Sequence, residues 1–218
     1  GVISDRNGEP LAVSTPVASI WINPKHIISE SDRWAELAAV LGMSRQKLKE
    51  KITQNSRRGF VYLRRHLSPQ LADQVLALRI KGVNVQREYK RYYPAGEVAS
   101  HIVGFTNIDD QGQEGMELAF ESWLKGESGS KRVLKDLHGN VFRDIGEGIS
   151  ASSGKDLMLS IDMRLQYLAY RELKAAMQRV DAKSGSVVML DSETGEVLAM
   201  VNQPSFNPNN RRALKPAH

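Results

Sequence analysis

Residues 91–126 read RYYPAGEVASHIVGFTNIDDQGQEGMELAFESWLKG, and the rest of the chain is organised around them. The stretch opens on the end of an aromatic strand that Pro94 stops, and it then passes through an apolar run to a polar turn at 107–112. Apolar residues near a 3.6-residue period follow and predict one helix over about 116–124. Five glycines stand at turns or element boundaries: Gly96, Gly104, Gly112, Gly115 and Gly126. Because glycine tolerates positive φ at an entropic cost, this punctuation indicates a specified backbone path.

The segments before this stretch alternate between strand and helix patterns. The Asn7-Gly8 dipeptide predicts a hairpin turn, and Ser44 and the Ser68-Pro69 pair are typical helix starts. Together the patterns indicate a small helical insert, at about 29–80, between strands. The predicted elements are a hairpin at 3–13, strands at 17–22, 60–63 and 83–93, and helices at 31–41, 44–52 and 68–80.

The segments after the stretch predict the beginning of a second domain. Residues 131–143 have a strand–turn–strand pattern around His138, and residues 147–156 are small and polar like a linker. Beyond the linker come a strand at 157–161, a helix that Asp162 caps and that runs to about 180, and strands at 186–190 and 197–202. We therefore predict a first domain at 1–146, the linker at 147–156 and an incomplete α/β segment at 157–218.

Length and composition restrict the class of protein. The chain has 218 residues, of which 41% are hydrophobic and 25% charged, which suits one or two globular domains. No apolar run approaches the roughly 18 residues of a membrane span, and no leader peptide is recognisable. Both ends are abrupt, so we expect a fragment of a longer protein. The absence of cysteine excludes disulfides, thiolate nucleophiles and cysteine–zinc sites.

The formal net charge is +5, with a pI of about 9.4. The basic residues occur in short clusters along the chain, which favours a solvated surface over a dedicated binding face. An alternative is a free-standing basic module that binds an anionic polymer, either peptidoglycan or nucleic acid. Basic residues among the tyrosines at 89–93 are its best support, because stacking plus charge suits single strands. A strand whose tyrosines pack inside the domain explains the same residues more simply.

A search for catalytic and metal-binding patterns returns no convincing group. The histidines lack the spacing of a zinc site, and no phosphate-binding glycine loop is present, so we predict neither metal nor cofactor. Ser-x-x-Lys occurs at 44–47 and at 128–131, but chance alone predicts about one such match. Ser44 stands where a helix cap belongs. The acidic residues at 114, 117 and 121 are explained by the dipole of the predicted helix.

Five segments, in order, carry a specific resemblance. They are GVISDRNGEPLA at 1–12, RYYPAGEVASHIVGF at 91–105, GQEGMELAFESWLKG at 112–126, LMLSIDMRLQ at 157–166 and SGSVVMLDSETGEVLAMVNQPSFNPNN at 184–210. The chain resembles the N-terminal region of class B penicillin-binding proteins, the division-specific members in particular. The resemblance implies an α+β fold. It would comprise an elongated, multi-lobed dimerisation or pedestal domain with β-hairpins and a helical insert, followed by the opening of an α/β transpeptidase domain.

The same resemblance implies a division of labour. In that family the Ser-x-x-Lys, Ser-x-Asn and Lys-Thr-Gly motifs lie beyond the position of Asn210, so this chain is expected to be inactive. The intact protein would be a D,D-transpeptidase at the periplasmic face of the inner membrane, held by one N-terminal helix. It would cross-link peptidoglycan through an acyl-serine and be acylated by β-lactams. The implied partners are the septal glycosyltransferase and other membrane proteins of the division machinery, peptidoglycan through the catalytic domain, and no nucleic acid.

The family motifs also supply candidate structural and docking residues. These are Arg6, Gly8, Arg91, Pro94, Gly96, His101, Gly104, Gly112, Gly115 and Glu117, with Glu97 beside them. We expect Arg6, Arg91 and Glu117 to form one ion-pair and hydrogen-bond set, because the planar guanidinium suits bidentate contacts. On this basis Arg91→Ala should cost about 1–3 kcal/mol.

Overall fold

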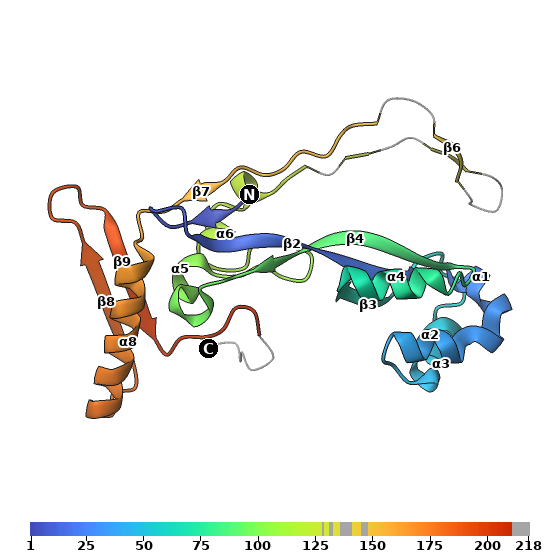
Figure 1. The fold of residues 1–218 in the computed structure, drawn as a ribbon, viewed down its shortest axis with the longest axis horizontal. Coiled ribbons are helices and arrows are strands. Elements are labelled where there is room, and N and C mark those ends of the chain that lie inside the picture. The colour runs from blue at the N-terminus through green and yellow to red at the C-terminus, as the bar shows by residue number, and fades with distance from the viewer. Residues whose placement is uncertain (128, 131–132, 136–140, 145–147, 211–218) are drawn as a thin grey trace. The chain divides into compact units, whose positions relative to one another are not determined.

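The computed structural model describes residues 1–127, 129–130, 133–135, 141–144 and 148–210 (Figure 1). The chain divides into two units, which are considered separately below. Unit 1 comprises Gly1–Ser14 and Arg91–His218, and unit 2 comprises Thr15–Lys90. Both contain strands and helices, so the predicted α+β class is confirmed.

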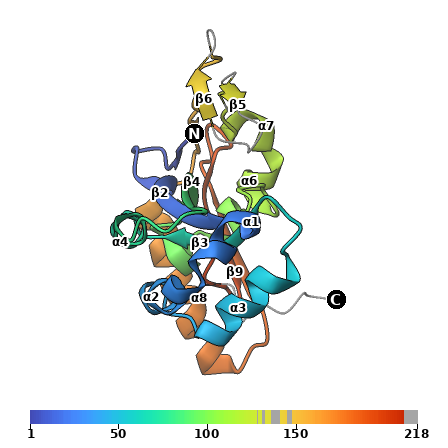
Figure 2. The ribbon, with the colours of Figure 1, turned by 90° about the vertical axis from the view of Figure 1, so that its right-hand side faces the viewer.

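Unit 2 is a three-stranded sheet with helices packed on it. Strand β2 (Pro10–Ile22), which begins in unit 1, pairs antiparallel with β3 (Val61–Leu67) and also pairs with β4 (Val83–Tyr92). Between β2 and β3 lie α1 (Pro24–Ile27), a 3-10 segment (Ile28–Arg33), α2 (Trp34–Val40) and α3 (Arg45–Gln54), and α4 (Pro69–Ala77) follows β3. Figure 2 shows α2 and α3 beside each other.

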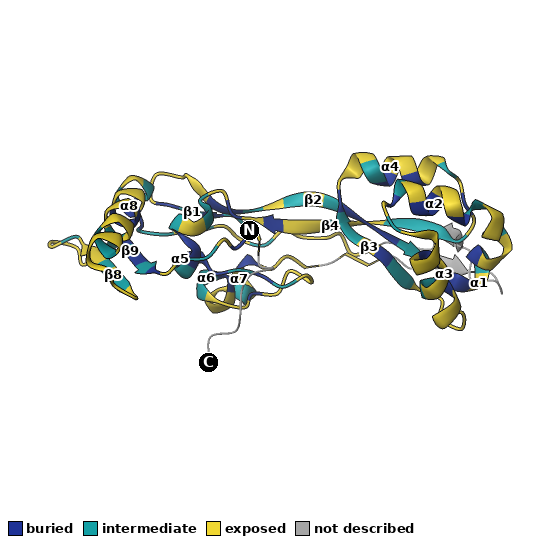
Figure 3. Ribbon diagram, turned by 90° about the horizontal axis from the view of Figure 1, so that it is seen from below, coloured by how far each residue is buried: buried dark blue, intermediate teal, exposed yellow. Residues whose placement is uncertain are grey.

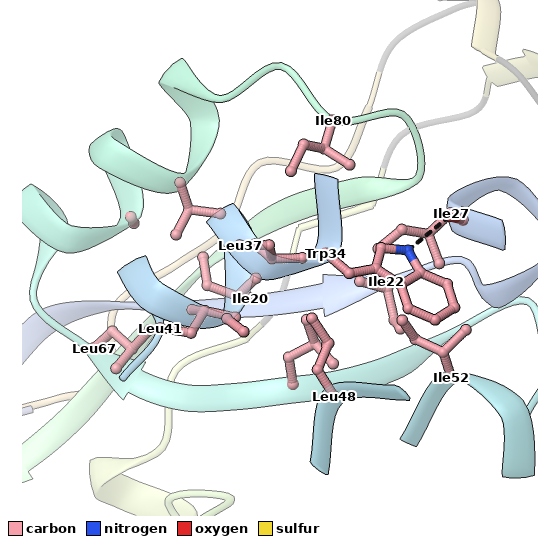
Figure 4. Packing of buried hydrophobic residues seen from close by; sticks show 14 of the residues in the cluster. Ile20, Ile22, Ile27, Trp34, Leu37, Leu41, Leu48, Ile52, Leu67 and Ile80 are labelled. Atoms are coloured by element: carbon pink, nitrogen blue, oxygen red, sulfur yellow. Dashed lines mark hydrogen bonds between the residues drawn. The ribbon is translucent and has the colours of Figure 1, made fainter. Parts of the chain in front are cut away.

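The core of unit 2 follows from the alternation of side chains along β2. Ala18, Ile20 and Ile22 point to one face, where the inner stripes of the helices cover them. Figure 4 shows this packing around Trp34, whose indole N–H donates to the carbonyl of Ile27 at 3.0 Å. Seven large side chains of this core are completely buried: Ile20, Ile22, Ile27, Leu37, Leu41, Leu48 and Ile52. The caps predicted at Ser44 and Ser68 are confirmed, because each hydroxyl accepts a backbone N–H of its helix.

Two strand predictions in unit 2 were wrong in extent. The apolar runs at 11–13 and 17–22 belong to one continuous strand, in which the Thr15 hydroxyl donates to the carbonyl of Lys90 at 3.0 Å. Strand β3 continues past Leu63 to Leu67 through a charged segment. That segment is stabilised by Glu88, whose carboxylate lies 3.3 Å from Arg65 and 3.6 Å from His66. Sequence patterns could not locate this partner, because it comes from another strand.

Unit 1 contains the predicted hairpin and all five segments that carry the family resemblance. Strand β1 (Ile3–Ser4) pairs antiparallel with β2 and parallel with β7 (Leu157–Met158). After β4 come a 3-10 turn (Gly96–Val98), α5 (Ser100–Val103), α6 (Gly115–Ala119) and α7 (Glu121–Leu124). Strands β5 (Val133–Lys135) and β6 (Val141–Asp144) pair antiparallel as predicted, while the turn around His138 lies outside the described residues.

The C-terminal part of unit 1 is helix α8 (Met163–Val180) packed on the antiparallel pair β8 (Gly185–Leu190) and β9 (Val197–Gln203). Asp162 caps α8 as predicted. The side of α8 next to β9 is buried and much of the rest is exposed (Figure 3). The expected strand at 157–161 is only two residues long, and Leu168, expected on the inner face of α8, is 43% exposed.

The prediction of a single helix over 116–124 was also wrong. The helix breaks at Phe120, whose φ is −114° and ψ is 24°, into the short helices α6 and α7. Leu118 and Trp123, expected to be inward, are 54% and 46% exposed, whereas Glu117 is only 3% exposed. The apolar period therefore identified only part of the inner face: Met116 and Leu124 pack in the core, while Glu117 is buried because its partner is a buried arginine.

Candidate functional site

The centre of unit 1 is a buried ion pair between Arg91 and Glu117. The guanidinium Nε lies 2.6 Å from Glu117 Oε1, and the two side chains are 6% and 3% exposed. Arg91 Nη1 also donates to the Gly1 carbonyl at 2.7 Å and to Ser14 Oγ at 3.0 Å. Burial raises the pKa of Glu117 and Arg91 opposes that rise. One arginine thus links the N-terminal segment, the end of β4 and α6.

Tyr93, two residues further on, joins the same region to the end of the chain. Its side chain is buried, its hydroxyl oxygen accepts the Thr106 N–H at 2.9 Å, and burial raises its pKa. The side-chain amide of Asn209 accepts from the Tyr93 N–H at 3.0 Å and donates to the Tyr93 carbonyl at 2.9 Å. Asn209 thereby pairs with the backbone as a neighbouring strand would.

Asp5, in the hairpin turn, binds both its own turn and the start of α8. Its Oδ1 accepts the N–H groups of Asn7 and Glu9, each at 2.8 Å, and its Oδ2 accepts the Met163 N–H at 3.1 Å. The Arg6 N–H donates to the Ile161 carbonyl at 2.9 Å. Asp5 is therefore an N-terminal cap supplied from a distant part of the chain, where a negative charge also favours the helix dipole.

The first turn of α8 is bonded to the segment that follows Gly96. Gln166 is completely buried, and its Nε2 donates to the carbonyls of Val98 at 2.8 Å and Met200 at 2.9 Å. Its Oε1 accepts the Met200 N–H at 2.8 Å. One turn later the Tyr170 hydroxyl donates to Glu97 Oε2 at 2.8 Å, with Lys174 Nζ 3.9 Å from the same oxygen. A single glutamine thus connects α8, β9 and the second family motif.

Aromatic packing closes the arrangement near the C-terminal end. The ring of Phe206 meets His101 edge-on at 5.3 Å and Phe105 at 5.8 Å between centroids. Burial lowers the pKa of His101, with a smaller opposing effect of Glu114. We call the set formed by Asp5, Glu97, Tyr93, Gln166, Tyr170, Phe206 and Asn209 the joint. Within unit 1 it ties residues 1–14 and 91–126 to residues 157–210.

The predicted site residues divide into those that the structure brings together and those that it does not. Arg91 and Glu117 meet, but Arg6 is not part of their set. Its guanidinium pairs instead with Glu196, at 3.3 Å on an exposed surface. Pro94 is exposed at the end of β4, and Gly8 and Gly96 lie at open turns with positive φ.

The remaining predicted glycines allow backbone segments to approach closely. Gly104 has φ +74°, and a Cβ there would lie 1.9 Å from the carbonyl oxygen of Glu114. A Cβ on Gly115, at φ +59°, would lie 2.5 Å from the carbonyl oxygen of Ile102, and one on Gly112 would lie 2.1 Å from that of Glu117. These glycines hold α5 against α6.

Asp5, Gln166 and Asn209 were missed from the sequence. A hint existed for Asp5, because an aspartate two residues before Asn-Gly commonly accepts the N–H groups of its own turn. Gln166 interrupts the apolar face of a predicted helix, and such a residue has to find partners when buried. Nothing in the sequence points to Asn209, since its partner is a backbone more than a hundred positions earlier.

Substitution of Asp5 tests its role as the N-terminal cap of α8. Burial alone would raise the Asp5 pKa, but the N–H groups of Met163, Glu9 and Asn7 hold it below its usual value. A carboxylate with a lowered folded-state pKa stabilises the fold above its unfolded-state pKa, and this contribution disappears as pH falls through the folded value. We expect Asp5→Ala to cost about 1–2 kcal/mol at pH 7, as measured by urea unfolding.

The same difference should shrink below about pH 4, where the unfolded aspartate begins to protonate. Asp73→Ala is the control, because Asp73 is an exposed aspartate in the interior of α4, where alanine is readily accommodated. A wild-type advantage over Asp5→Ala that stayed constant into strong acid would contradict the carboxylate as the source.

The described residues contain neither a metal-binding cluster nor a membrane-spanning helix. No three His, Asp or Glu side chains of that part of the chain are grouped as metal ligands, and none of its helices has the length and hydropathy of a membrane span. The joint itself consists of hydrogen bonds and aromatic contacts.

Two known families match parts of this chain. Residues 1–159 match the penicillin-binding protein dimerisation domain, and residues 185–216 match the penicillin-binding protein transpeptidase domain. The joint contains residues of both matched segments and of α8, which lies between them.

Individual relatives agree as well. The chain is 47% identical to the peptidoglycan D,D-transpeptidase FtsI of Escherichia coli K12, across 96% of the chain and 36% of that protein. It is 44% identical to a probable peptidoglycan D,D-transpeptidase, PbpC, of Pseudomonas aeruginosa, across 100% of the chain and 38% of that protein. It therefore spans little more than a third of these relatives.

Among solved structures, penicillin-binding protein 2X of Streptococcus thermophilus shares the fold, with a TM-score of 0.69 over 100% of this chain and 36% of that one, at 23% identity. From the match of residues 1–159 and the identity to FtsI, the chain belongs to the FtsI-like class B penicillin-binding proteins, of which it covers the non-catalytic N-terminal domain and the start of the transpeptidase domain.

Proposed function

We propose that this chain is the pedestal and partner-docking part of a septal peptidoglycan D,D-transpeptidase at the periplasmic face of the inner membrane. The pedestal carries the transpeptidase domain and fixes its orientation through the joint. Catalysis, acylation by penicillin and contact with peptidoglycan belong to the rest of the transpeptidase domain. The septal glycosyltransferase and other membrane proteins of the division machinery are its partners.

The observation that carries the proposal is the bonding of α8. This first helix of the C-terminal segment receives its cap from Asp5, and its buried Gln166 is bonded to Val98. Both partners lie in the segment that matches the dimerisation domain. The first turn of α8 is held at Met163 and Gln166, and its second turn is held where Tyr170 donates to Glu97. A helix held over its first two turns has its direction set by that domain, which is the requirement for a support that positions a catalytic domain.

Labelling with a fluorescent penicillin tests the non-catalytic role. We expect no covalent label on this chain, while a full-length division-specific penicillin-binding protein, run alongside, is labelled. The physical reason is that Ser44, the serine of one Ser-x-x-Lys match, uses its hydroxyl to cap α3 through the Lys47 N–H at 3.2 Å. Mass spectrometry would identify any acylated residue, and a penicilloyl group on Ser44 or Ser128 would overturn the proposal.

Binding to the septal glycosyltransferase tests the docking role. The chain should bind the purified glycosyltransferase in detergent, as measured by surface plasmon resonance. An unrelated basic protein of similar size is the control, since a charge of +5 alone can produce weak association. No binding, or binding no tighter than that of the control, would count against docking by this part of the protein.

A further inference from the structure

The basic residues of this protein are concentrated in unit 2. Residues 15–90 contain fourteen Lys and Arg against six Asp and Glu, a formal charge of +8, whereas the whole chain carries +5. The rest of the chain is therefore acidic, at −3. The other sixteen Lys and Arg lie in unit 1, where nineteen Asp and Glu outnumber them, so unit 2 attracts anions more strongly than the total charge indicates.

Several of these cations already have structural partners. Lys51 Nζ donates to the carbonyls of Tyr62 and Leu63, each at 3.1 Å, and an Arg64 N–H donates to the carbonyl of Leu41. Arg33 pairs with Glu36 at 3.0 Å, and Arg65 pairs with Glu88 at 3.3 Å. Cations engaged in this way are not available to a ligand without a loss of stability.

Arg45 and Lys49 differ from these residues. Both are exposed, and among the described residues neither forms an ion pair or a side-chain hydrogen bond. They stand four positions apart on α3, so they project from the same face of the helix. Between them and the 3-10 segment lies an open pocket with a volume of about 520 Å³. Its lining residues are Ser31, Asp32, Trp34, Arg45, Gln46 and Lys49.

The chemistry of the pocket selects among anions. Trp34 belongs to the core and is 7% exposed, so it gives the pocket only a small apolar edge, which a methylene group can contact. Ser31 and Gln46 supply a hydroxyl and an amide. Asp32 supplies one carboxylate, which disfavours a densely charged polyanion and favours a ligand that also has N–H donors. A peptide with glutamate side chains fits this lining: its methylenes can contact Trp34, its separated carboxylates can pair with the two cations, and its backbone N–H groups can donate to Asp32.

We infer that this pocket of unit 2 binds an acidic, glutamate-containing segment of a partner protein. The inference rests on the docking part of the proposed function and gives that docking a chemical class. Arg45 and Lys49 bind the carboxylates, while Trp34 contacts the glutamate stem. Because the two cations are solvent-exposed, their attraction is screened by salt, and the interaction contributes more to specificity and association rate than to affinity.

Fluorescence anisotropy with a fluorescein-labelled peptide of alternating Glu and Ser tests the inference. The chain should bind this peptide, with affinity that falls as salt rises, and should not bind the alternating Gln and Ser peptide. Arg45→Glu combined with Lys49→Glu should weaken binding by about tenfold or more, since each reversal replaces an attraction with a repulsion.

Arg179→Glu combined with Lys183→Glu is the matched control, because these exposed residues at the end of α8 give the same change in net charge. It should alter binding by less than about twofold. Arg45→Gln combined with Lys49→Gln removes both charges without reversing them, so it tests the same contacts if the charge-reversed variant does not fold. It should also weaken binding. Circular dichroism of each variant checks that the helices are retained.

A nuclear magnetic resonance titration localises the site. Of the indole N–H signals of the three tryptophans, that of Trp34 should shift on addition of the acidic peptide, and those of Trp21 and Trp123 should not. Equal weakening by both charge-reversed pairs, no binding of the acidic peptide, or its displacement by an equal charge concentration of inorganic polyphosphate would each overturn the inference. These results test only the peptide-binding pocket. The proposed function is tested separately, by penicillin labelling and by binding to the glycosyltransferase.

Discussion

Arg91→Ala should lower the free energy of unfolding of unit 1 by about 3–5 kcal/mol, as followed by urea denaturation. This exceeds the 1–3 kcal/mol expected from sequence, because both charges proved to be buried. Removal of the guanidinium leaves the Glu117 carboxylate at 3% exposure without its counterion, and it also leaves the Gly1 carbonyl and the Ser14 hydroxyl without their donor. An uncompensated buried charge is among the few defects that cost this much.

The controls separate burial from charge. Arg171→Ala removes an arginine from an exposed pair with Glu172, where the side chains are 58% and 60% exposed, and should cost less than about 1 kcal/mol. Arg91→Met combined with Glu117→Leu removes both charges and should restore much of the stability lost in Arg91→Ala. A loss below about 1 kcal/mol for Arg91→Ala, or additive losses in the double variant, would refute the buried pair as the central contact of unit 1.

Gln166→Ala should cost about 2–3 kcal/mol and should loosen the joint. The change leaves the carbonyls of Val98 and Met200 and the Met200 N–H without their partner, inside a region where Gln166 itself is completely buried. Unpaired buried backbone groups carry the full desolvation cost, and the truncated side chain also leaves a cavity. Amide hydrogen exchange reports the effect directly, because the Met200 N–H should exchange roughly thirtyfold faster or more.

Gln178→Ala supplies the matched comparison, since Gln178 is exposed on the same helix and alanine is the better helix former. It should leave the Met200 exchange rate and the unfolding free energy nearly unchanged. Gln166→Glu adds a second test: its carboxylate still accepts the Met200 N–H but no longer donates to two carbonyls. Unchanged exchange at Met200 in Gln166→Ala would mean that Gln166 does not hold α8 to β9.

Local features were predictable because short-range physics determines them. The Asn7-Gly8 turn, the caps at Ser44, Ser68 and Asp162 and the paired strands after α8 depend on residues within a few positions of each other. The stretch at 91–126 contains both partners of the buried ion pair. Its Arg91 and Glu117 meet, and its glycines hold α5 against α6.

The sequence by itself determined the family and the α+β class, because ordered motifs and local patterns carry that information. Only the tertiary structure decided which polar residues are buried. Glu117 and Gln166 are buried where hydrophobic periodicity predicted Leu118 and Leu168. Arg6 pairs with Glu196 and does not join the Arg91–Glu117 pair. The physical reason is that a buried polar group is stable only beside its partner, and these partners lie far away in sequence.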